Sequence, residues 1–154
     1  MGFFETTRKL SIAEQTLAKS VFKTFLPYTK ILIGDHTGLG GAPWTEQYAG
    51  TFTLHMGEVA YADCTSSRWT TGVGTIRNTF IHELTHVWQA QKGGRFYLPL
   101  MRHPFCRYRY ELEPGWAFSR YGLEQQAEIV RHRFLADRGE QVPIVPPASL
   151  LPFA

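Results

Sequence analysis

The sequence predicts one domain of the α+β class, mostly helical and with a small antiparallel β-sheet. A length of 154 residues suits a single domain, and a composition that is 44% hydrophobic and 14% aromatic can fill one core. Apolar residues recur at helical spacing in three separate segments. Short apolar runs between the first two of these segments are bounded by turn residues, which is typical of strands. No repeat or change of composition divides the chain, so residues 1–154 are expected to form one unit.

The first helix is expected over residues 11–25. Ser11 and Glu14 match a capping box, in which the serine hydroxyl accepts a backbone N–H and the glutamate reaches back to the serine N–H. Apolar residues then follow at helical spacing, and Pro27 stops the helix. Residues 30–34, KILIG, form a short apolar run between turn signals and predict a strand.

The next segment, residues 35–48, is rich in glycine. It lacks both the spacing and the lysine of a phosphate-binding loop, so it is expected to be an ordinary loop. Residues 51–55 and 58–61 are short runs with strand-forming residues on either side of Gly57. Together they predict a β-hairpin that turns at this glycine.

Two more helices are expected in the C-terminal half of the chain. One covers residues 75–92 and ends at the glycine pair that follows. The other covers residues 118–137 or 121–137 and is stopped at Gly139. Between the two helices, aromatic residues alternate over 106–110 in a pattern that can form a strand.

The C-terminal tail, residues 143–154, is rich in proline. It holds four of the nine prolines of the chain, at positions 143, 146, 147 and 152. Proline lacks the backbone N–H that a helix needs, so we expect the tail to lie extended over the surface or to hang free.

Charge and hydropathy exclude several classes of partner. The formal net charge is +3 and the basic residues are scattered, whereas a nucleic-acid-binding domain carries a dense basic stripe. No run of about 18 apolar residues exists, so no membrane span is expected. The N-terminus has no apolar signal-peptide core, which predicts synthesis in the cytoplasm without a signal peptide. Cys64 and Cys106 are expected to be buried thiols, or a single disulfide if the protein works outside the cytoplasm.

The strongest chemical signal is HELTH, residues 82–86, inside the helix predicted over 75–92. His82 and His86 are four residues apart and share one helix face, so both imidazoles can bind one tetrahedral Zn²⁺. Glu83 lies beside this face, where its carboxylate can take a proton from a water that the metal polarises. The pattern H-E-x-x-H within an apolar helix is typical of zinc hydrolases. The alternative is a solvated helix face on which these residues are merely polar.

A catalytic zinc site needs a third protein ligand, which must come from further along the chain. Glu124 and Glu128 are four residues apart in the last predicted helix, with the small Ala127 between them. We expect Glu124 to bind the metal and Glu128 to accept the N–H of a ligand histidine. Two alternatives stay open: both glutamates face solvent and pair with Arg120 and Arg131, or another residue, Glu128 included, is the ligand. The remaining candidates for the third ligand are His103, Glu111, Glu113 and His132.

These motifs resemble those of known zinc peptidases. The combination of HELTH with a later E-x-x-A-E is similar to that of the gluzincins, among them the CaaX-processing and heat-shock membrane proteases. More closely, LSIAEQTLAKSVF, IHELTHVWQAQKGG and YGLEQQAEIV, in this order, resemble small bacterial metallopeptidase domains known as Vgr-related or Rhs-associated. The resemblance implies a zincin-like fold, with His82, His86 and Glu124 as zinc ligands and Glu83 as the base.

Some domains of this kind are C-terminal effectors of type VI secretion spike proteins. The resemblance therefore implies a bacterial source, a secretion spike as carrier, a cognate immunity protein, and delivery as an antibacterial toxin into the periplasm of a target cell. This chain carries no spike sequence, so we expect its export to depend on a carrier.

Peptide hydrolysis builds an oxyanion that a second donor usually stabilises beside the metal. The candidates for this donor are Tyr108, Tyr110, Tyr121 and His132. Of these we expect Tyr110 to fill the role. The strand predicted over 51–55 precedes the active helix and is expected to be the edge strand on which an extended peptide pairs. This arrangement would bring His55 near the cleft, although a lone histidine at a turn is more often polar surface.

The predicted function is zinc-dependent hydrolysis of peptide bonds in a protein or peptide substrate. One alternative is a zinc-binding or interaction module without turnover. Glu83 argues against this alternative, because a structural zinc site has no use for a base. Another alternative is a zinc hydrolase of peptidoglycan peptides, which the sequence does not separate from a protease.

Overall fold

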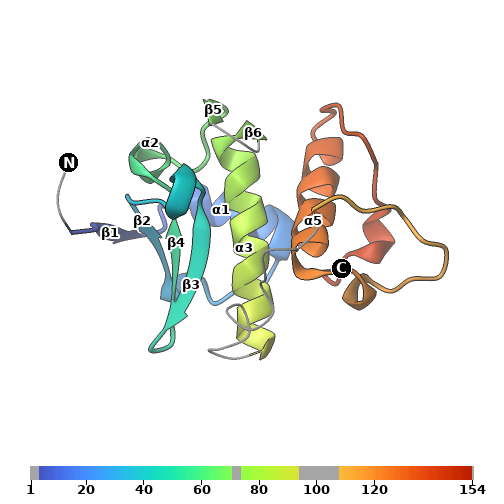
Figure 1. The fold of residues 1–154 in the computed structure, drawn as a ribbon, viewed down its shortest axis with the longest axis horizontal. Helices are drawn as coiled ribbons and strands as arrows, with labels where there is room; N and C mark the ends of the chain where they lie inside the picture. The colour runs from blue at the N-terminus through green and yellow to red at the C-terminus, as the bar shows by residue number, and fades with distance from the viewer. Residues whose placement is uncertain (1–3, 71–73, 94–107, 154) are drawn as a thin grey trace.

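A computed structural model describes residues 4–70, 74–93 and 108–153. Helix α3 (Ile76–Gly93) stands between a four-stranded sheet on one side and helix α5 (Leu123–Asp137) on the other (Figure 1). Helix α1 (Ile12–Phe22) contributes Ala18 and Phe22 to the same core, and both are fully buried. The α+β class predicted from the sequence is confirmed.

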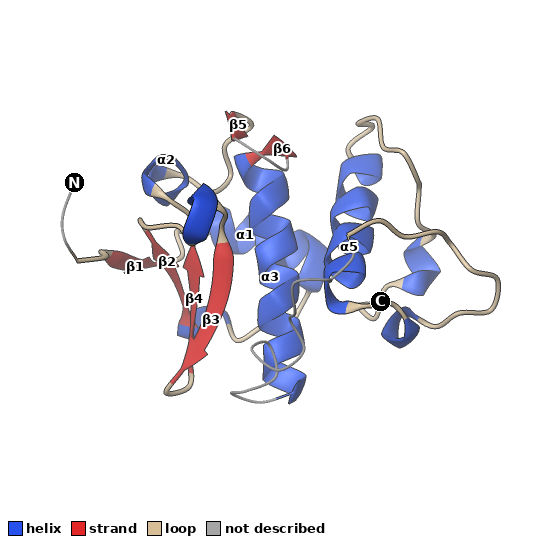
Figure 2. Cartoon of the chain, viewed as in Figure 1, coloured by secondary structure: helices blue, strands red, loops and turns tan. Residues whose placement is uncertain are grey.

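Four strands form the sheet in the order β1–β2–β4–β3 (Figure 2). They are β1 (Thr7–Lys9), β2 (Ile31–Gly34), β3 (Trp44–Tyr48) and β4 (Thr51–His55). Strand β2 runs parallel to β4, while the pairs β1–β2 and β3–β4 are antiparallel. The sheet is therefore mixed, which corrects the prediction of an antiparallel one. Parallel neighbours cannot be joined by a tight turn, and here the connection between them passes through β3.

The hairpin of this sheet joins β3 to β4, so the prediction of a loop over residues 35–48 is wrong for the part that forms β3. Tyr48 pairs with Thr51, and Ala49 and Gly50 form the turn with φ angles of 50° and 78°. Positive φ at both turn positions matches the twist of antiparallel strands and sets their register. The hairpin places β3 at the edge of the sheet, in contact with α3.

The hairpin predicted around Gly57 is wrong in its second half. Residues Glu58–Ala62 form helix α2, and Gly57, with a φ of 90°, precedes its first turn. Strand β4 already has β2 on one side and β3 on the other, so no partner position is left for a following strand. The chain therefore leaves the sheet after His55 and forms α2, whose Ala60 is buried.

The three long helices predicted from the sequence are present, with small changes at their ends. The capping box of α1 is confirmed: Glu14 N–H donates to Ser11 Oγ (3.1 Å), and Ser11 N–H donates to Glu14 Oε2 (2.8 Å). Helix α1 ends at Phe22 rather than at residue 25, where Lys23 leaves helical geometry with a φ of 52°. The remaining elements are the 3₁₀ turns η1 (Tyr28–Lys30), η2 (Leu39–Gly41), η3 (Phe118–Arg120) and η4 (Ala148–Leu150), and the ribbon of β5 (Trp69–Thr70) and β6 (Gly74–Thr75).

The proline-rich tail packs against the domain instead of hanging free. Phe153 is 3% exposed, and its ring centroid lies 4.8 Å from that of Phe22 and 5.3 Å from that of Trp88. Burying an aromatic side chain in this way contributes roughly 1.5–3 kcal/mol. The tail thus covers one end of the core that α1 and α3 form.

Some predictions fall on residues outside the described ranges. Cys64 is buried, and its thiol contacts Ala60 O at 3.2 Å, whereas Cys106 and His103 lie outside the part that the structure describes. Of the strand predicted over 106–110, only residues 108–110 are described, and they form no regular element. Among the described helices, none has both the length and the apolarity needed to cross a membrane.

A buried carboxylate ties the N-terminal elements together. Glu14 is fully buried, and Arg8 on β1 donates to its two oxygens at 2.7 and 2.8 Å. Cys64 N–H donates to Glu14 Oε1 at 3.0 Å, which links α1 to the segment after α2. Burial by itself would raise the pKa of Glu14, but the hydrogen bonds from Arg8 and from the two backbone N–H groups outweigh it, so the pKa lies below its ordinary value.

Removing the Arg8 guanidinium should therefore lower the free energy of unfolding by much more than the loss of a surface ion pair would. We expect Arg8→Ala to lower the free energy of unfolding by about 3 kcal/mol, because it leaves an uncompensated buried charge. Lys9→Ala, at the exposed neighbouring position, is the matched control and should change stability by less than about 0.5 kcal/mol. Urea denaturation of the two variants measures the difference, and equal stabilities would refute the role of Arg8.

Candidate metal centre

Helices α3 and α5 build the centre between them. Helix α3 lies between the sheet and α5, and all its residues from Asn78 to Ala90 are buried, including His82, Glu83 and His86. A helix that is covered on more than one side can bury polar residues only if each finds a partner. The partners of the two histidines come largely from the first turns of α5.

Three ligand atoms converge at the contact of the two helices. Glu124 Oε2 lies 3.0 Å from His82 Nε2 and 3.1 Å from His86 Nε2, and the two nitrogens are 3.3 Å apart. The three residues are 4%, 0% and 4% exposed for His82, His86 and Glu124. This group can hold a metal ion, since each residue offers one ligand atom to a common point.

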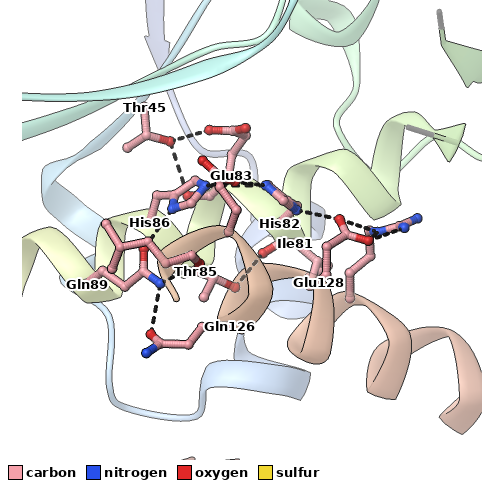
Figure 3. A network of polar contacts seen from close by, with 12 residues as sticks. Thr45, Ile81, His82, Glu83, Thr85, His86, Gln89, Gln126 and Glu128 are labelled. Carbon is pink, nitrogen blue, oxygen red and sulfur yellow. Dashed lines mark hydrogen bonds and ion pairs between the residues drawn. The ribbon is translucent and has the colours of Figure 1, made fainter. Parts of the chain in front are cut away.

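A carboxylate on α5 fixes the orientation of the His82 ring through its Nδ1 atom. The Nδ1–H group of His82 donates to Glu128 Oε1 at 2.9 Å, because a carboxylate can only accept (Figure 3). Arg131 holds the same carboxylate with Nε contacts of 3.1 and 3.2 Å and a further contact from its Nη2. The orientation leaves Nε2 of His82 directed at Glu124 and His86.

A side-chain amide orients the second ring in the same manner. His86 Nδ1–H donates to Gln89 Oε1 at 2.7 Å (Figure 3). The amide group of Gln89 is itself fixed, because its Nε2 donates to Leu123 O and to Gln126 Oε1, both at 3.0 Å. Both imidazoles therefore direct Nδ1 to an acceptor and turn Nε2 towards the common point.

The Glu83 side chain reaches towards Thr45 and the sheet (Figure 3). The hydroxyl of Thr45 on β3 lies 2.7 Å from Glu83 Oε2 and 3.1 Å from Glu83 O. Both residues are buried, so this donor offsets part of the cost of taking the Glu83 carboxylate out of water. The edge strand of the sheet thus holds the carboxylate that follows His82 in the sequence.

The electrostatics of the centre follow from this pairing. Burial opposes the charged form of His82 and is the largest effect, but hydrogen bonds to Glu124 and Glu128 outweigh it and raise the pKa of His82 to about 9. Burial would raise the pKa of Glu128, yet His82 and Arg131 lower it to about 2. The pKa of Glu124 lies well below its ordinary value, because the hydrogen bonds from the two histidines outweigh its burial.

Two pockets are lined in part by residues of α3 or α5. One, of about 640 Å³, is lined by Thr79, one helical turn before Glu83, and by Pro43, which precedes β3. The other, of about 760 Å³, is lined by Glu128 and by Tyr108. The Tyr108 ring lies nearly parallel to that of His82, with centroids 6.1 Å apart.

The structure brings the residues predicted for the metal site together. The alternative in which Glu124 and Glu128 face solvent is wrong, since they are 4% and 6% exposed. Tyr110, the predicted oxyanion donor, is buried with its hydroxyl 2.6 Å from His132 Nδ1, on the side of α5 that carries Glu128. Burial raises the pKa of Tyr110 above its ordinary value. Its catalytic role stays a prediction. The other acidic candidates, Glu111 and Glu113, are exposed.

Two residues of the centre were not assigned from the sequence. Gln89 follows His86 by three residues, a spacing that places both on one helix face and could have indicated the contact. The contact of Thr45 was harder to predict than that of Gln89, because its partner Glu83 is distant in the sequence and the segment of Thr45 was predicted to be a loop. The strand-forming residues of Trp44–Tyr48, followed by a glycine turn, were the available indication.

Comparison with known proteins gives a consistent result. No model of a known protein family matches the chain. Over 142 residues it is 34% identical to the type VI secretion system spike protein VgrG2b of Pseudomonas aeruginosa strain PAO1, and the match covers 85% of this chain but 13% of that protein. Among solved structures, the effector domain of P. aeruginosa VgrG2b is 31% identical, with a TM-score of 0.58, and the match covers 85% of this chain and 75% of that one.

The raised pKa of His82 predicts how the metal-free protein responds to pH. A histidine whose pKa rises on folding stabilises the fold fully below its ordinary pKa, and this contribution is lost as the pH passes the folded value. With a rise from 6.5 to about 9, we expect unfolding in a chelator to become easier between these pH values. The loss is on the order of 3 kcal/mol.

The matched control for this pH effect is His82→Gln, which removes the titrating group. Denaturation curves of the two proteins between pH 6 and 9.5 test the prediction. A wild-type protein that keeps its stability over this range would contradict the assigned charge of His82.

Proposed function

The chain belongs to the family of the VgrG2b effector domain, and from this premise and the buried cluster of His82, His86 and Glu124 we propose that it is a zinc-dependent peptidase. The observation that carries the proposal is the convergence of two imidazole nitrogens and one carboxylate oxygen on a single point, with the Nδ1 of each ring held by an acceptor. Glu83, next to the first histidine, supplies the base.

The donor set favours zinc among divalent metals. Two imidazoles and one carboxylate are a common ligand set of catalytic zinc, and they leave a fourth position open. Zinc bonds of 2.0–2.1 Å at tetrahedral angles put ligand atoms about 3.3 Å from one another. The separations of 3.0, 3.1 and 3.3 Å between the three atoms are close to this value.

The chain's own groups divide the work of hydrolysis. When bound, zinc supplies a Lewis acid that makes water more acidic and polarises a carbonyl group. The Glu83 carboxylate takes the proton of the attacking water and later delivers it to the leaving amine. Thr45 holds one oxygen of that carboxylate, which fixes the direction in which Glu83 presents the other. Glu128 and Gln89 keep the two imidazoles in the orientation that exposes Nε2.

Strand β3 and the pocket beside it suit an extended peptide substrate. β3 lies at the edge of the sheet and in contact with α3, so its outer backbone groups can pair with a peptide. This corrects the prediction that gave the edge position to residues 51–55, which lie inside the sheet. In this proposal the pocket lined by Pro43 and by Thr79, one helical turn before Glu83, receives a substrate side chain.

A zinc module without turnover is the competing proposal, and the setting of Glu83 speaks against it. A buried carboxylate costs free energy, and the Thr45 group that hydrogen-bonds to Glu83 is a neutral hydroxyl. A site that only held a metal would be more stable with an apolar residue there. A buried ionisable group that costs stability, at a position beside a metal site, is typical of catalytic groups.

The effector family suggests how the domain reaches its substrate. The relative VgrG2b is a spike protein of a type VI secretion system, and this chain spans 13% of its length. We propose that the domain travels with such a spike from the bacterial cytoplasm to the periplasm of a target cell, where it acts on a protein or peptide. A cognate immunity protein would then protect the producing cell.

Metal analysis tests the ligand set. We expect about one zinc per chain in the wild-type protein, and a large loss of zinc in Glu124→Ala, which removes a ligand. Glu128→Ala removes only the acceptor behind His82 and should weaken zinc binding by about 10–100-fold. A competition titration with a chromophoric chelator measures both variants. The reverse order would assign the ligand role to Glu128.

Hydrolysis tests the base. Glu83→Gln keeps the size of the side chain and its contact with Thr45, so it should bind zinc like the wild-type protein. We expect it to lose hydrolysis of an unfolded protein substrate by at least about 100-fold, because the amide cannot accept the proton. Zinc content is the internal control. A variant with full zinc and full activity would exclude Glu83 as the base.

A further inference from the structure

The side-chain amide of Asn78, in the first turn of α3, is an exception to the pairing of buried polar groups on this helix. Three side chains in the described part of the protein have a buried polar atom without a hydrogen-bond partner: Gln47, Arg77 and Asn78. Gln47 and Arg77 are only partly buried, and Arg77 still pairs with Glu140 through Nη2. Asn78 is 4% exposed, and its Oδ1 is the atom that lacks a partner.

Asn78 lies one helical turn before His82, on the side of α3 that meets α5. Residues four apart share a helix face, with Cβ atoms about 5–6 Å from each other. His82 contacts Glu128 of α5, and Arg131 follows Glu128 by one turn. A Cβ atom placed on Gly74 would lie 3.5 Å from Asn78 Nδ2 and 3.6 Å from Arg131 Nη1. The amide is therefore at the contact of the two helices, next to the metal centre.

Asn78 adjoins residues that line both of the pockets described above. Thr79, the next residue of α3, lines the pocket of about 640 Å³ together with Trp69, whose Cζ3 lies 3.8 Å from the same Cβ position on Gly74. Arg131 lines the pocket of about 760 Å³. Trp69 is 81% exposed, and a large aromatic side chain beside a pocket is available to a ligand. A ligand held in either pocket can therefore extend towards Asn78.

The unpaired acceptor lowers the stability of the free protein. A buried polar atom without a partner loses its hydrogen bonds to water and gains none in return. Gln126 on α5 shows the usual arrangement of a buried amide: its Nε2 donates to Tyr121 O at 2.8 Å, and its Oε1 accepts from Gln89 Nε2 at 3.0 Å. A leucine has nearly the shape of asparagine and would fill the position of Asn78 without this cost. The amide therefore indicates a partner that comes from outside the chain.

The chemistry of the amide fits a peptide group. Its oxygen accepts and its nitrogen donates, which complements the N–H and C=O of a main chain. An anionic ligand would need a cation, and the neighbouring guanidinium of Arg131 is already held by the Glu128 carboxylate. An uncharged ligand with an N–H group matches the unpaired Oδ1, and every peptide unit except one that ends in proline offers such a group.

We propose that Asn78 binds the main chain of the substrate, with its Oδ1 accepting an N–H group of the peptide close to the bond that is cleaved. The hydrogen bond forms only in the complex, so the stability that the amide costs in the free protein is recovered when the peptide binds. A main-chain contact does not depend on the side chains of the substrate. The inference rests on the proposed function for the identity of the ligand, whereas the unpaired amide does not.

Thermal unfolding in a chelator tests the unpaired amide without any substrate. Asn78→Leu removes the buried acceptor and keeps the shape of the side chain, so we expect the Tm to rise by about 3 °C. Gln126→Met is the matched control: it removes a buried amide that is paired and leaves Tyr121 O without its donor, so the Tm should fall by about 3 °C. A Tm of Asn78→Leu below that of the wild-type protein would show that the amide is paired in the free protein, and would overturn the proposal.

Binding of an unfolded protein tests the ligand. The probe is fluorescently labelled β-casein, titrated into zinc-loaded Glu83→Gln, which is expected to bind a substrate without cleaving it. Adding Asn78→Leu to this variant should weaken binding about tenfold, because one hydrogen bond to a buried group is lost. Equal zinc content of the two proteins is the control for the metal. Equal affinity of the two proteins for β-casein would overturn the proposal.

The outcomes separate this inference from the peptidase. A wild-type protein that cleaves nothing, while the tenfold difference in β-casein binding is found, would count against the peptidase and leave the role of Asn78 standing. Cleavage of β-casein by the wild-type protein and by Asn78→Leu at equal kcat/KM would leave the peptidase standing and refute the role of Asn78. Absence of any β-casein binding by Glu83→Gln would overturn both.

Discussion

The structure depends on how α3 and α5 bury charge together. Two histidines of α3 and two glutamates of α5 lie in a contact from which water is largely excluded. A single unpaired charge in such a place costs several kcal/mol, so the helices are held where every member finds a partner. Rotating α5 by one residue would separate Glu124 from His82 and His86 at once. The metal centre and the packing of the helices are therefore one constraint.

The sheet contributes a second constraint from the other side of α3. Side chains of the edge strand β3 make contacts on both faces of the sheet. Thr45 contacts Glu83 on the face that packs against α3, while Trp44 and Glu46 contact His55 on the opposite face. A strand at the edge of a sheet can pair with an extended peptide, but it has fewer backbone hydrogen bonds within the sheet to keep it in place. The contacts with His55 add to those of the β3–β4 ladder.

Local patterns predicted the helices well, and non-local pairing explains the errors. The capping box, the apolar spacing of α3 and the four-residue spacing of both ligand pairs are set within one or two helical turns. The strand partners of residues 44–62 are not. Whether Glu58–Ala62 continues as a strand depends on whether β4 has a free side, and β2, more than ten residues earlier, decides that.

By itself, the sequence determined the α+β class, the helix that carries HELTH and the pair of glutamates one turn apart, because each of these rests on spacing along a single element. Only the tertiary structure decided that Glu124, not Glu128, shares its oxygen with both histidines, and that Thr45 and His55 belong to the same strand pair on opposite faces. The physical reason is that a side chain's partner across a helix or strand contact is chosen by packing of the whole chain, and no local period records it.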